Sequence, residues 1–208
     1  MGMKKSTKKR KSPVPLGRPR SFDIERALDR ALQVFWHKGY EGTTLSDLTG
    51  AMGINRPSLY AAFGNKETLF RKALDRYVDG PAAYVRKALE QPTACAVVKR
   101  LLHGAVDSLT GPHTPPGCLM VQAALSCGKA ADPIRQELAS RRAAGEIAIR
   151  RRFKRAIREG DLPANADAAD LARYVGTVIH GMAVQAAGGA RRRELLRVVE
   201  TALRAWPR

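Results

Sequence analysis

Residues 43–70 constrain the fold of this chain more than any other segment, because helix signals and helix breakers alternate there at short spacing. The first helix signal begins at Thr44, which stands three residues before Asp47 in the pattern of a capping box. The apolar residues that then repeat at i, i+3 and i+7 are Leu45, Leu48 and Met52. Gly53 follows where helices commonly end in a left-handed residue, so the pattern predicts a short helix with one buried face.

A second short helix is predicted directly after this turn. Asn55 is placed to cap it, and Pro57 lies in its first turn, where the missing N–H is not needed. Leu59 and Phe63 are four residues apart and therefore share the inward face, and Gly64 ends the helix. The residues left on the outer side are Arg56, Ser58, Tyr60, Ala61 and Ala62.

A third helix is predicted after Asn65, which caps it. Its apolar residues follow a period of 3.6 residues. They are Leu69, Phe70, Ala73, Leu74, Tyr77 and Val78. Two short helices joined by a tight turn are the layout of a helix-turn-helix, whose second helix enters the major groove of DNA. The sequence therefore predicts a DNA-reading unit in its first third.

The rest of the chain carries helical periods and no segment with the period of a strand, which predicts an all-α fold. The expected helices lie over 22–38, 66–91, 93–109, 118–127, 133–159, 166–187 and 191–205. Helix 66–91 is expected to bend near Gly80 and Pro81, because proline interrupts the ladder of hydrogen bonds.

Over residues 22–79 the sequence resembles the DNA-binding domain of the tetracycline-repressor (TetR) family of bacterial transcription regulators. The matching fragments are GYEGTT at 39–44, DL at 47–48, GI at 53–54, SLY at 58–60, Phe63 and NKETL at 65–69. Shorter fragments, GCLMVQAA at 117–124 and GDLP at 160–163, resemble the C-terminal domain of that family. Two departures are Thr49, where the family usually has alanine, and the small pair Ala61 and Ala62 before Phe63.

The resemblance implies an N-terminal three-helix helix-turn-helix domain. Helix four of the family, here the helix expected over 66–91, links it to a C-terminal helical domain that binds a ligand and forms a dimer. The expected division is a disordered basic arm over 1–20, a DNA-binding domain over 21–66 and a ligand-binding and dimerisation domain over 67–208. Dimers of the family commonly form through the last two long helices, here 166–187 and 191–205. The perimeter of 166–187 is apolar on several sides, as expected of a helix that contacts both its own domain and a partner. The alternative is that 166–187 is simply a central core helix.

Charge supports a polyanionic partner. The chain has 37 Lys and Arg against 19 Asp and Glu, a formal net charge of +18, and neutralising phosphates releases condensed counterions. The basic residues of the first twenty positions are Lys4, Lys5, Lys8, Lys9, Arg10, Lys11, Arg18 and Arg20. Arg18 and Arg20 are candidates for an adjacent minor groove, while the lysines before them suit diffuse attraction to phosphates.

Arg56 and Ser58 are the candidates for contacts with base edges, because arginine pairs in bidentate fashion with guanine. The resemblance assigns phosphate contacts to Thr44, Tyr60 and Lys66, and the N-terminus of helix four adds a favourable dipole. The complete predicted DNA-binding set is Arg18, Arg20, Thr43, Thr44, Asn55, Arg56, Pro57, Ser58, Tyr60, Ala61 and Lys66.

An effector pocket is expected among the helices of residues 93–187. The candidate walls and polar contacts are Leu102, His103, Val106, Met120, Gln122, Leu125, Phe153, Tyr174, His180 and Met182. Residues of these types at helical spacing more commonly fill an ordinary core, and a lone histidine more commonly bonds to a backbone group. The three cysteines, Cys95, Cys118 and Cys127, lack the spacing of a metal site, and Cys118 has a redox role as an open alternative.

Together with these features, the resemblance implies a cytoplasmic, nucleoid-associated regulator: a dimeric repressor that a small molecule releases from a palindromic operator. Ligand binding is expected to shift helix four and change the separation of the two reading helices, which lie about 34–36 Å apart on DNA. The alternative is an architectural DNA-binding protein without an effector. No metal ligands, phosphate loop or paired nucleophile is apparent, so neither an enzyme, a cofactor nor a bound metal is expected.

Overall fold

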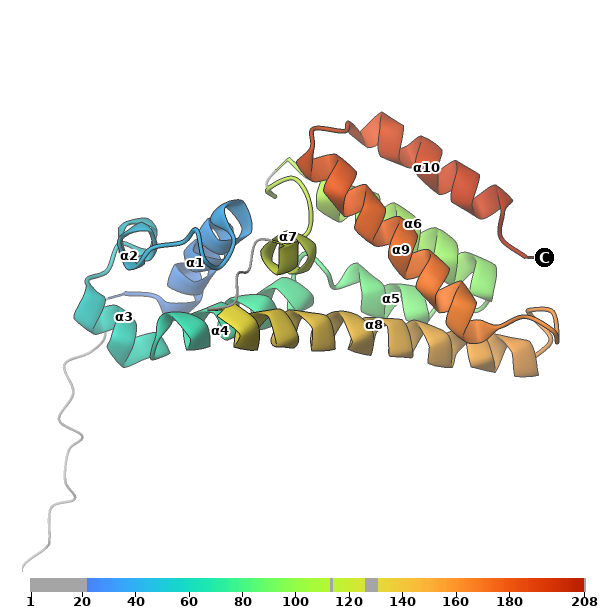
Figure 1. Cartoon of the computed structure of the whole chain (residues 1–208), viewed down its shortest axis with the longest axis horizontal. Coiled ribbons are helices and arrows are strands. Elements are labelled where there is room, and N and C mark those ends of the chain that lie inside the picture. The colour runs from blue at the N-terminus through green and yellow to red at the C-terminus, as the bar shows by residue number, and fades with distance from the viewer. Residues whose placement is uncertain (1–21, 113, 126–130, 208) are drawn as a thin grey trace, which may run out of the picture.

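The computed structural model describes residues 22–112, 114–125 and 131–207. Every regular element in these ranges is an α-helix, so the predicted all-α fold is confirmed. The first six helices are α1 Ile24–Lys38, α2 Leu45–Met52, α3 Arg56–Phe63, α4 Lys66–Asp79, α5 Tyr84–Leu89 and α6 Ala94–Leu109. They are followed by α7 Leu119–Leu125, α8 Asp132–Arg158, α9 Ala168–Ala187 and α10 Arg192–Arg204 (Figure 1). No helix of these ranges is both long and apolar enough to cross a bilayer.

The predicted caps of the first helices are present. The Thr44 hydroxyl accepts a hydrogen bond from the Asp47 N–H while the Asp47 carboxylate accepts one from the Thr44 N–H, which completes a capping box. Asn55 caps α3 and Asn65 caps α4 through their side-chain oxygens. Gly53 adopts φ +69° and ψ +33° at the end of α2, a left-handed conformation that costs an L side chain energy. Short-range signals therefore fix all three helix starts.

Helices α1 to α4 form the N-terminal head, at the left of Figure 1, around an aromatic core. The Phe35 and Phe70 rings meet edge to face with centroids 5.0 Å apart, and those of Trp36 and Tyr77 do so at 4.8 Å. Such pairs add to the free energy gained by burial alone. All four residues are buried, and they lock α1 onto α4.

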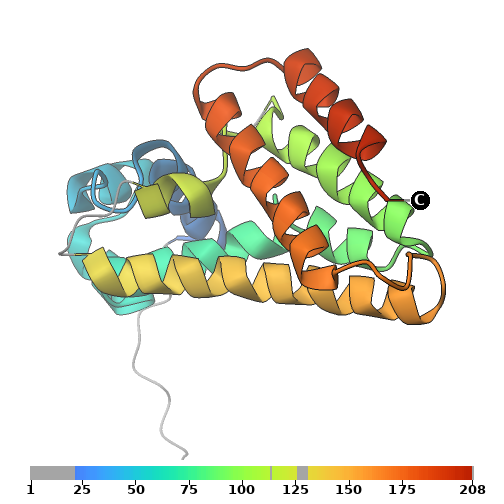
Figure 2. The ribbon, with the colours of Figure 1, turned by 45° about the vertical axis from the view of Figure 1, so that its right-hand side comes forward.

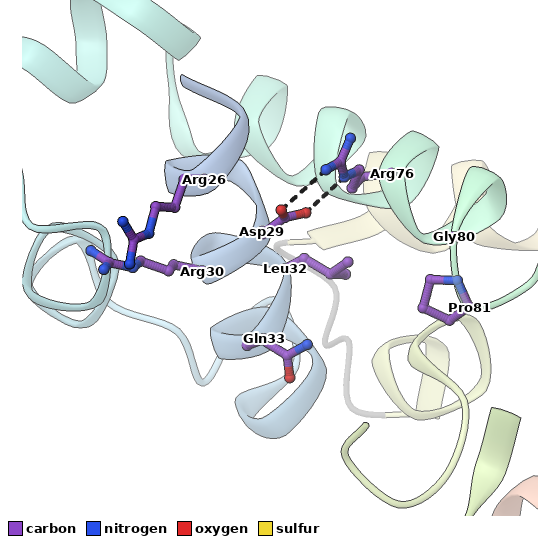
Figure 3. A pocket seen from close by; sticks show the side chains of 8 residues that line it. All are labelled: Arg26, Asp29, Arg30, Leu32, Gln33, Arg76, Gly80 and Pro81. Carbon is purple, nitrogen blue, oxygen red and sulfur yellow. Dashed lines mark hydrogen bonds and ion pairs between the residues drawn. The ribbon is translucent and has the colours of Figure 1, made fainter. Parts of the chain in front are cut away.

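An ion pair joins the outer sides of the same two helices. The Arg76 guanidinium on α4 contacts both carboxylate oxygens of Asp29 on α1, at 2.7 and 3.1 Å (Figure 3). Its Nη1 also lies 3.0 Å from Glu25, and these carboxylates raise the pKa of Arg76. Because the pair is solvent-exposed, its contribution to stability is small. Its planar, two-pronged geometry links the outer sides of α1 and α4 in a specific arrangement.

The predicted single helix over 66–91 is wrong, because the chain breaks completely between Asp79 and Tyr84. The Gly80 N–H still donates to the Arg76 carbonyl, which closes the last turn of α4. Pro81 follows, and its ring cannot be accommodated in a continuing helix and offers no N–H. The chain turns over 80–83 and starts again as α5. The break separates a helix of the head from one of the C-terminal bundle.

Helices α5, α6, α9 and α10 pack with the C-terminal half of α8 into a second core (Figure 2). This core contains Ile149 and Phe153 of α8. The N-terminal half of the same helix contributes Ile134 and Leu138 to the core of the head. Helix α7 also belongs to both cores, since Leu119 packs in the head and Val121 in the bundle. Two helices therefore connect the head mechanically to the bundle.

Candidate nucleic-acid interface

The outer face of α3 is the candidate DNA-reading surface. Leu59 and Phe63 are buried and hold α3 against the head, so the opposite side points away from the molecule. The predicted reading residues that lie exposed there are Asn55, Arg56, Pro57, Tyr60 and Ala61. Tyr60 keeps 48% of its surface accessible, which is unusual for a large aromatic side chain. Ser58 is half-buried beside them.

Arg56 does not extend freely from the start of α3. Its Nη2 donates a hydrogen bond to the Ser46 hydroxyl in the first turn of α2, at 3.2 Å. The hydrogen bond restricts an otherwise flexible side chain and holds the guanidinium on the reading side of the turn. Sequence reasoning missed Ser46. Its place two residues after the capping Thr44 is the signal that could have identified it.

The two threonines before α2 lie in different surroundings. Thr43 is only 1% exposed, and its hydroxyl donates to the Gly39 carbonyl at 2.6 Å, so its side chain holds the turn rather than facing outward. Thr44 is exposed, and its hydroxyl donates to Asp47 at 2.8 Å. Of this pair, only Thr44 has an exposed side chain.

Asp47 places a negative charge at this end of the surface and is itself neutralised. Lys38 lies 2.6 Å from its Oδ1. The hydrogen bond from Lys38 lowers the pKa of Asp47 to about 2, with further contributions from the Thr44 N–H and hydroxyl. The ionised carboxylate also suits the positive N-terminal end of the α2 dipole. Lys38 thus keeps the N-terminus of α2 compatible with a polyanion.

Lys66 begins α4 at the other end of the surface. Its Nζ lies 4.5 Å from the centroid of the Tyr40 ring, a cation–π geometry. Partial burial lowers the pKa of Lys66, and the nearby Glu41 opposes that effect. The ring therefore orients the ammonium group at a helix N-terminus, where phosphate is bound favourably. The remaining predicted contacts, Arg18 and Arg20, fall outside the described residues.

A cavity of about 370 Å³ lies in the C-terminal part between α4, α5, α6, α7, α8 and α9. Of the predicted ligand residues whose side chains the structure describes, Met120 and His180 line it. The residues that instead lie in the bundle core are Leu102, Val106, Phe153 and Met182. Tyr174 is exposed on α9, and His103 and Gln122 are half-buried on α6 and α7. The Leu125 side chain is outside the described residues.

The cavity has walls that sequence reasoning did not assign to it. Its apolar side chains include Tyr77, Tyr84, Val85, Leu101, Val121, Ile149 and Ile179. Its charged side chains are Arg141, Arg142, Glu146 and Arg173. Arg141 and Arg142 belong to the charge-rich helix α8, whose pattern resembles a solvated surface, and Arg173 is an isolated cation on the apolar helix α9, so no local signal identified them. Cys118 also faces the cavity and accepts a hydrogen bond from the Tyr77 hydroxyl at 3.2 Å.

Comparisons with known proteins agree with this division into a head and a bundle. The family described as "Bacterial regulatory proteins, tetR family" matches residues 27–73. The family described as "Tetracyclin repressor-like, C-terminal domain" matches residues 94–203. The first match lies within the head and the second within the C-terminal bundle, and residues 1–26, 74–93 and 204–208 lie outside both.

One relative matches nearly the whole chain, and another matches about a third of it. The HTH-type transcriptional repressor ComR of Escherichia coli K12 is 36% identical over 193 residues, which are 92% of either protein. The HTH-type transcriptional repressor BdcR of the same organism is 47% identical over 70 residues, or 34% of this chain.

Solved structures include a triple cysteine mutant of the TetR family transcriptional regulator CifR, complexed with 26-bp double-strand operator DNA. It is 46% identical, with a TM-score of 0.88 over 92% of this chain and 100% of that one. A TetR transcriptional regulator from Rhodococcus sp. RHA1 is 42% identical, with a TM-score of 0.61 over 89% of this chain and 100% of that one.

Proposed function

Because the chain belongs to the tetR family of bacterial regulatory proteins, we propose that it is a cytoplasmic, dimeric repressor that a small molecule releases from its operator. It is a helix-turn-helix transcriptional regulator, and this family membership agrees with the expectation that it is not an enzyme. The observation that carries the proposal is the exposed outer face of α3, held in place by its caps and by the Arg56–Ser46 hydrogen bond.

The exposed positions of the described side chains support a set of DNA contacts around α3. Arg56 and Ser58 read base edges, while Thr44, Tyr60 and Lys66 contact phosphates on either side. The similarity to CifR, which is complexed with operator DNA, supports this docking of α3 in the major groove. Arg18 and Arg20 enter the neighbouring minor groove. Together these groups bind one half-site, with specificity from α3 and affinity from the flanking cations.

The dimer forms through α9 and α10. Tyr174 and Val184 on α9 and Val198 on α10 are exposed although they are large and apolar. Tyr174, Val178 and Val198 border one hollow between the two helices. Apolar surface of this kind on a soluble regulator suits contact with a second copy. A two-fold axis there presents the two α3 helices to the half-sites of a palindrome.

The effector occupies the cavity between α4 and α9. Helices α7 and α8, which contribute to both cores, support transmission of a change at the cavity to the head. An effector weakens operator binding only if it binds more tightly to the conformation in which the spacing of the two α3 helices does not match the operator. The architectural alternative rests on the net charge of +18 alone.

Footprinting of the full-length protein on the DNA upstream of its own gene tests the proposal. We expect a two-fold symmetric protected site that persists under competition by bulk DNA at moderate salt. Arg56→Ala should relax the preference for that site, whereas Lys66→Ala should weaken binding to all sequences about equally. If bulk DNA abolished the protection, the architectural function would be supported instead. If the Arg56→Ala variant still discriminated between sites, a different residue would have to read the bases.

A further inference from the structure

We propose that the cavity binds an amphipathic organic anion, with its acidic group held by Arg142 and His180 and its apolar body enclosed by the aromatic and aliphatic walls. This inference names the class of effector and so rests on the proposed function. The cavity volume of about 370 Å³ lies within the range of small-molecule sites. Among the described residues, three arginines line the cavity, Arg141, Arg142 and Arg173. The carboxylates that pair with each of them determine which charge a ligand can carry.

The three arginines that line the cavity differ in how closely carboxylates pair with them. Arg141 contacts Asp75 at 2.8 Å and Glu137 at 2.7 Å, so two carboxylates already balance its charge. Arg173 pairs more loosely with Glu146 and Asp170, at 3.7 and 3.6 Å.

Arg142 has no carboxylate partner within the described ranges. Its Nη1 donates to the Met120 carbonyl at 2.7 Å, and the side chain is half-buried. A guanidinium carries five N–H donors, so donors remain for another acceptor.

His180 faces the same space as Arg142. Partial burial lowers the pKa of His180, and the Arg142 charge lowers it further, with Glu146 opposing both. These effects require that Arg142 and Glu146 on α8 lie near the imidazole on α9. A carboxylate entering there would contact two cationic or donor groups from two helices. The apolar walls exclude water and thereby strengthen that contact.

A neutral or cationic ligand fits the site less well. An uncharged ligand that covered Arg142 would remove water from a cation without replacing its hydrogen bonds, which is unfavourable. A cationic ligand would meet repulsion from Arg142 and Arg173. An anion avoids both penalties, because guanidinium and carboxylate match in geometry as well as charge. The Glu146 carboxylate also lines the cavity, and its pairing with Arg173 at 3.7 Å reduces its repulsion of an anion. The buried walls formed by Leu101, Val121 and Ile149 then select for an apolar body.

The same arginine connects the cavity to the head. Met120 lies in α7, so an anion that draws Arg142 away from the Met120 carbonyl releases one of the restraints on α7. The turn before α7 is bonded to α1, because the Gly117 carbonyl accepts a hydrogen bond from the Trp36 indole. Binding of the acidic group is thereby coupled to the position of the reading head.

Isothermal titration of the full-length protein with octanoate and naphthoate tests the inference, with octanamide, naphthamide and octylamine as matched neutral and cationic probes. We expect at least one carboxylate to bind, and its amide to bind at least about tenfold more weakly. Arg142→Gln should weaken carboxylate binding by at least about tenfold, and Arg151→Gln, an exposed arginine on the same helix, should not. The inference would be overturned if the amide bound as tightly as the acid or if neither carboxylate bound. It would also be overturned if Arg142→Gln left the carboxylate affinity unchanged.

Binding should also tighten as the pH falls from about 8 to about 6, because an anion favours the protonated form of His180. His180→Gln should flatten this dependence. The other titratable groups around the cavity are Arg141, Arg142, Glu146, Arg173, Tyr77, Tyr84 and Cys118. Operator binding without any ligand is measured in parallel. Intact, site-specific operator binding without a carboxylate effect would reject the effector class alone, whereas loss of site preference would reject the proposed function.

Discussion

The indole Nε1 of Trp36 donates a 3.1 Å hydrogen bond to the carbonyl oxygen of Gly117, a residue 81 positions later in the chain. Both groups are buried, so this bond ties α1 of the head to the turn before α7. Gly117 has φ +92°, and a Cβ there would lie 2.9 Å from the Gln122 side chain. The turn is therefore built around a glycine whose carbonyl is fixed by the head.

Trp36→Phe should lower the free energy of unfolding by about 1–3 kcal/mol more than its control, because the Gly117 carbonyl loses its donor. Urea denaturation measures this difference. Trp206→Phe is the matched control, since its indole N–H is buried without a partner in the described residues and both changes remove the same ring volume. Equal losses in the two variants would show that the hydrogen bond contributes nothing.

Gly53→Ala should destabilise the protein by about 1–2 kcal/mol, because Gly53 adopts φ +69° at the end of α2. Gly50→Ala, three residues earlier in the helix, should instead stabilise it by about 0.5–1 kcal/mol, since a Cβ there meets no other atom. Chemical denaturation of both variants checks the pair. The changes in the free energy of unfolding should have opposite signs in the two variants. A stabilised Gly53→Ala variant would contradict the left-handed conformation at Gly53.

The pKa of Asp47 is lowered from 3.8 to about 2 by its hydrogen bonds to Lys38 and Thr44. A carboxyl group with a depressed pKa contributes stability that is present above the unfolded value of 3.8 and lost as the pH falls through about 2. The difference in melting temperature between the wild type and Asp47→Asn should therefore shrink across that window. A difference that stays constant from neutral to acid pH would rule out this ion pair as its source.

Val198→Glu should weaken the dimer, because Val198 on α10 is 41% exposed and borders the proposed interface. Light scattering coupled to size exclusion compares the mass of this variant with that of the wild type. Val78→Glu, an equally exposed valine on α4 of the head, serves as control. The expected result is dissociation of Val198→Glu alone, with loss of operator affinity. A dimeric Val198→Glu, or a monomeric wild type, would disprove the assignment.

The helix starts were predictable from the sequence because their causes lie within four residues. Thr44 and Asn55 each bond to a group three positions later, so the signal and its effect share one window. Gly53 likewise acts on its own φ angle. The exposed face of α3 followed from the same local pattern, once Leu59 and Phe63 were assigned to the core.

The parts that sequence reasoning missed depend on contacts between distant segments. Nothing near Trp36 indicates that its N–H would meet Gly117, and Arg142 resembles any other cation on a long polar helix. The sequence predicted only a bend at Pro81, because tertiary packing decides whether a helix continues past a proline with a kink or ends there. Cavity walls come from six helices, and their assembly is a property of the tertiary structure.

The sharing of α7 and α8 between two cores makes the reading unit inseparable from the C-terminal half of the chain. A fragment that stopped at Asp79 would lack the side of its core that Leu119, Ile134 and Leu138 fill. Such a fragment would carry every DNA-contacting residue of the head and yet expose an apolar gap. Substitutions on the DNA-facing side of α3 therefore leave the bundle unchanged. Joining this head to a different sensor domain would also require α7 and α8, because they fill that gap.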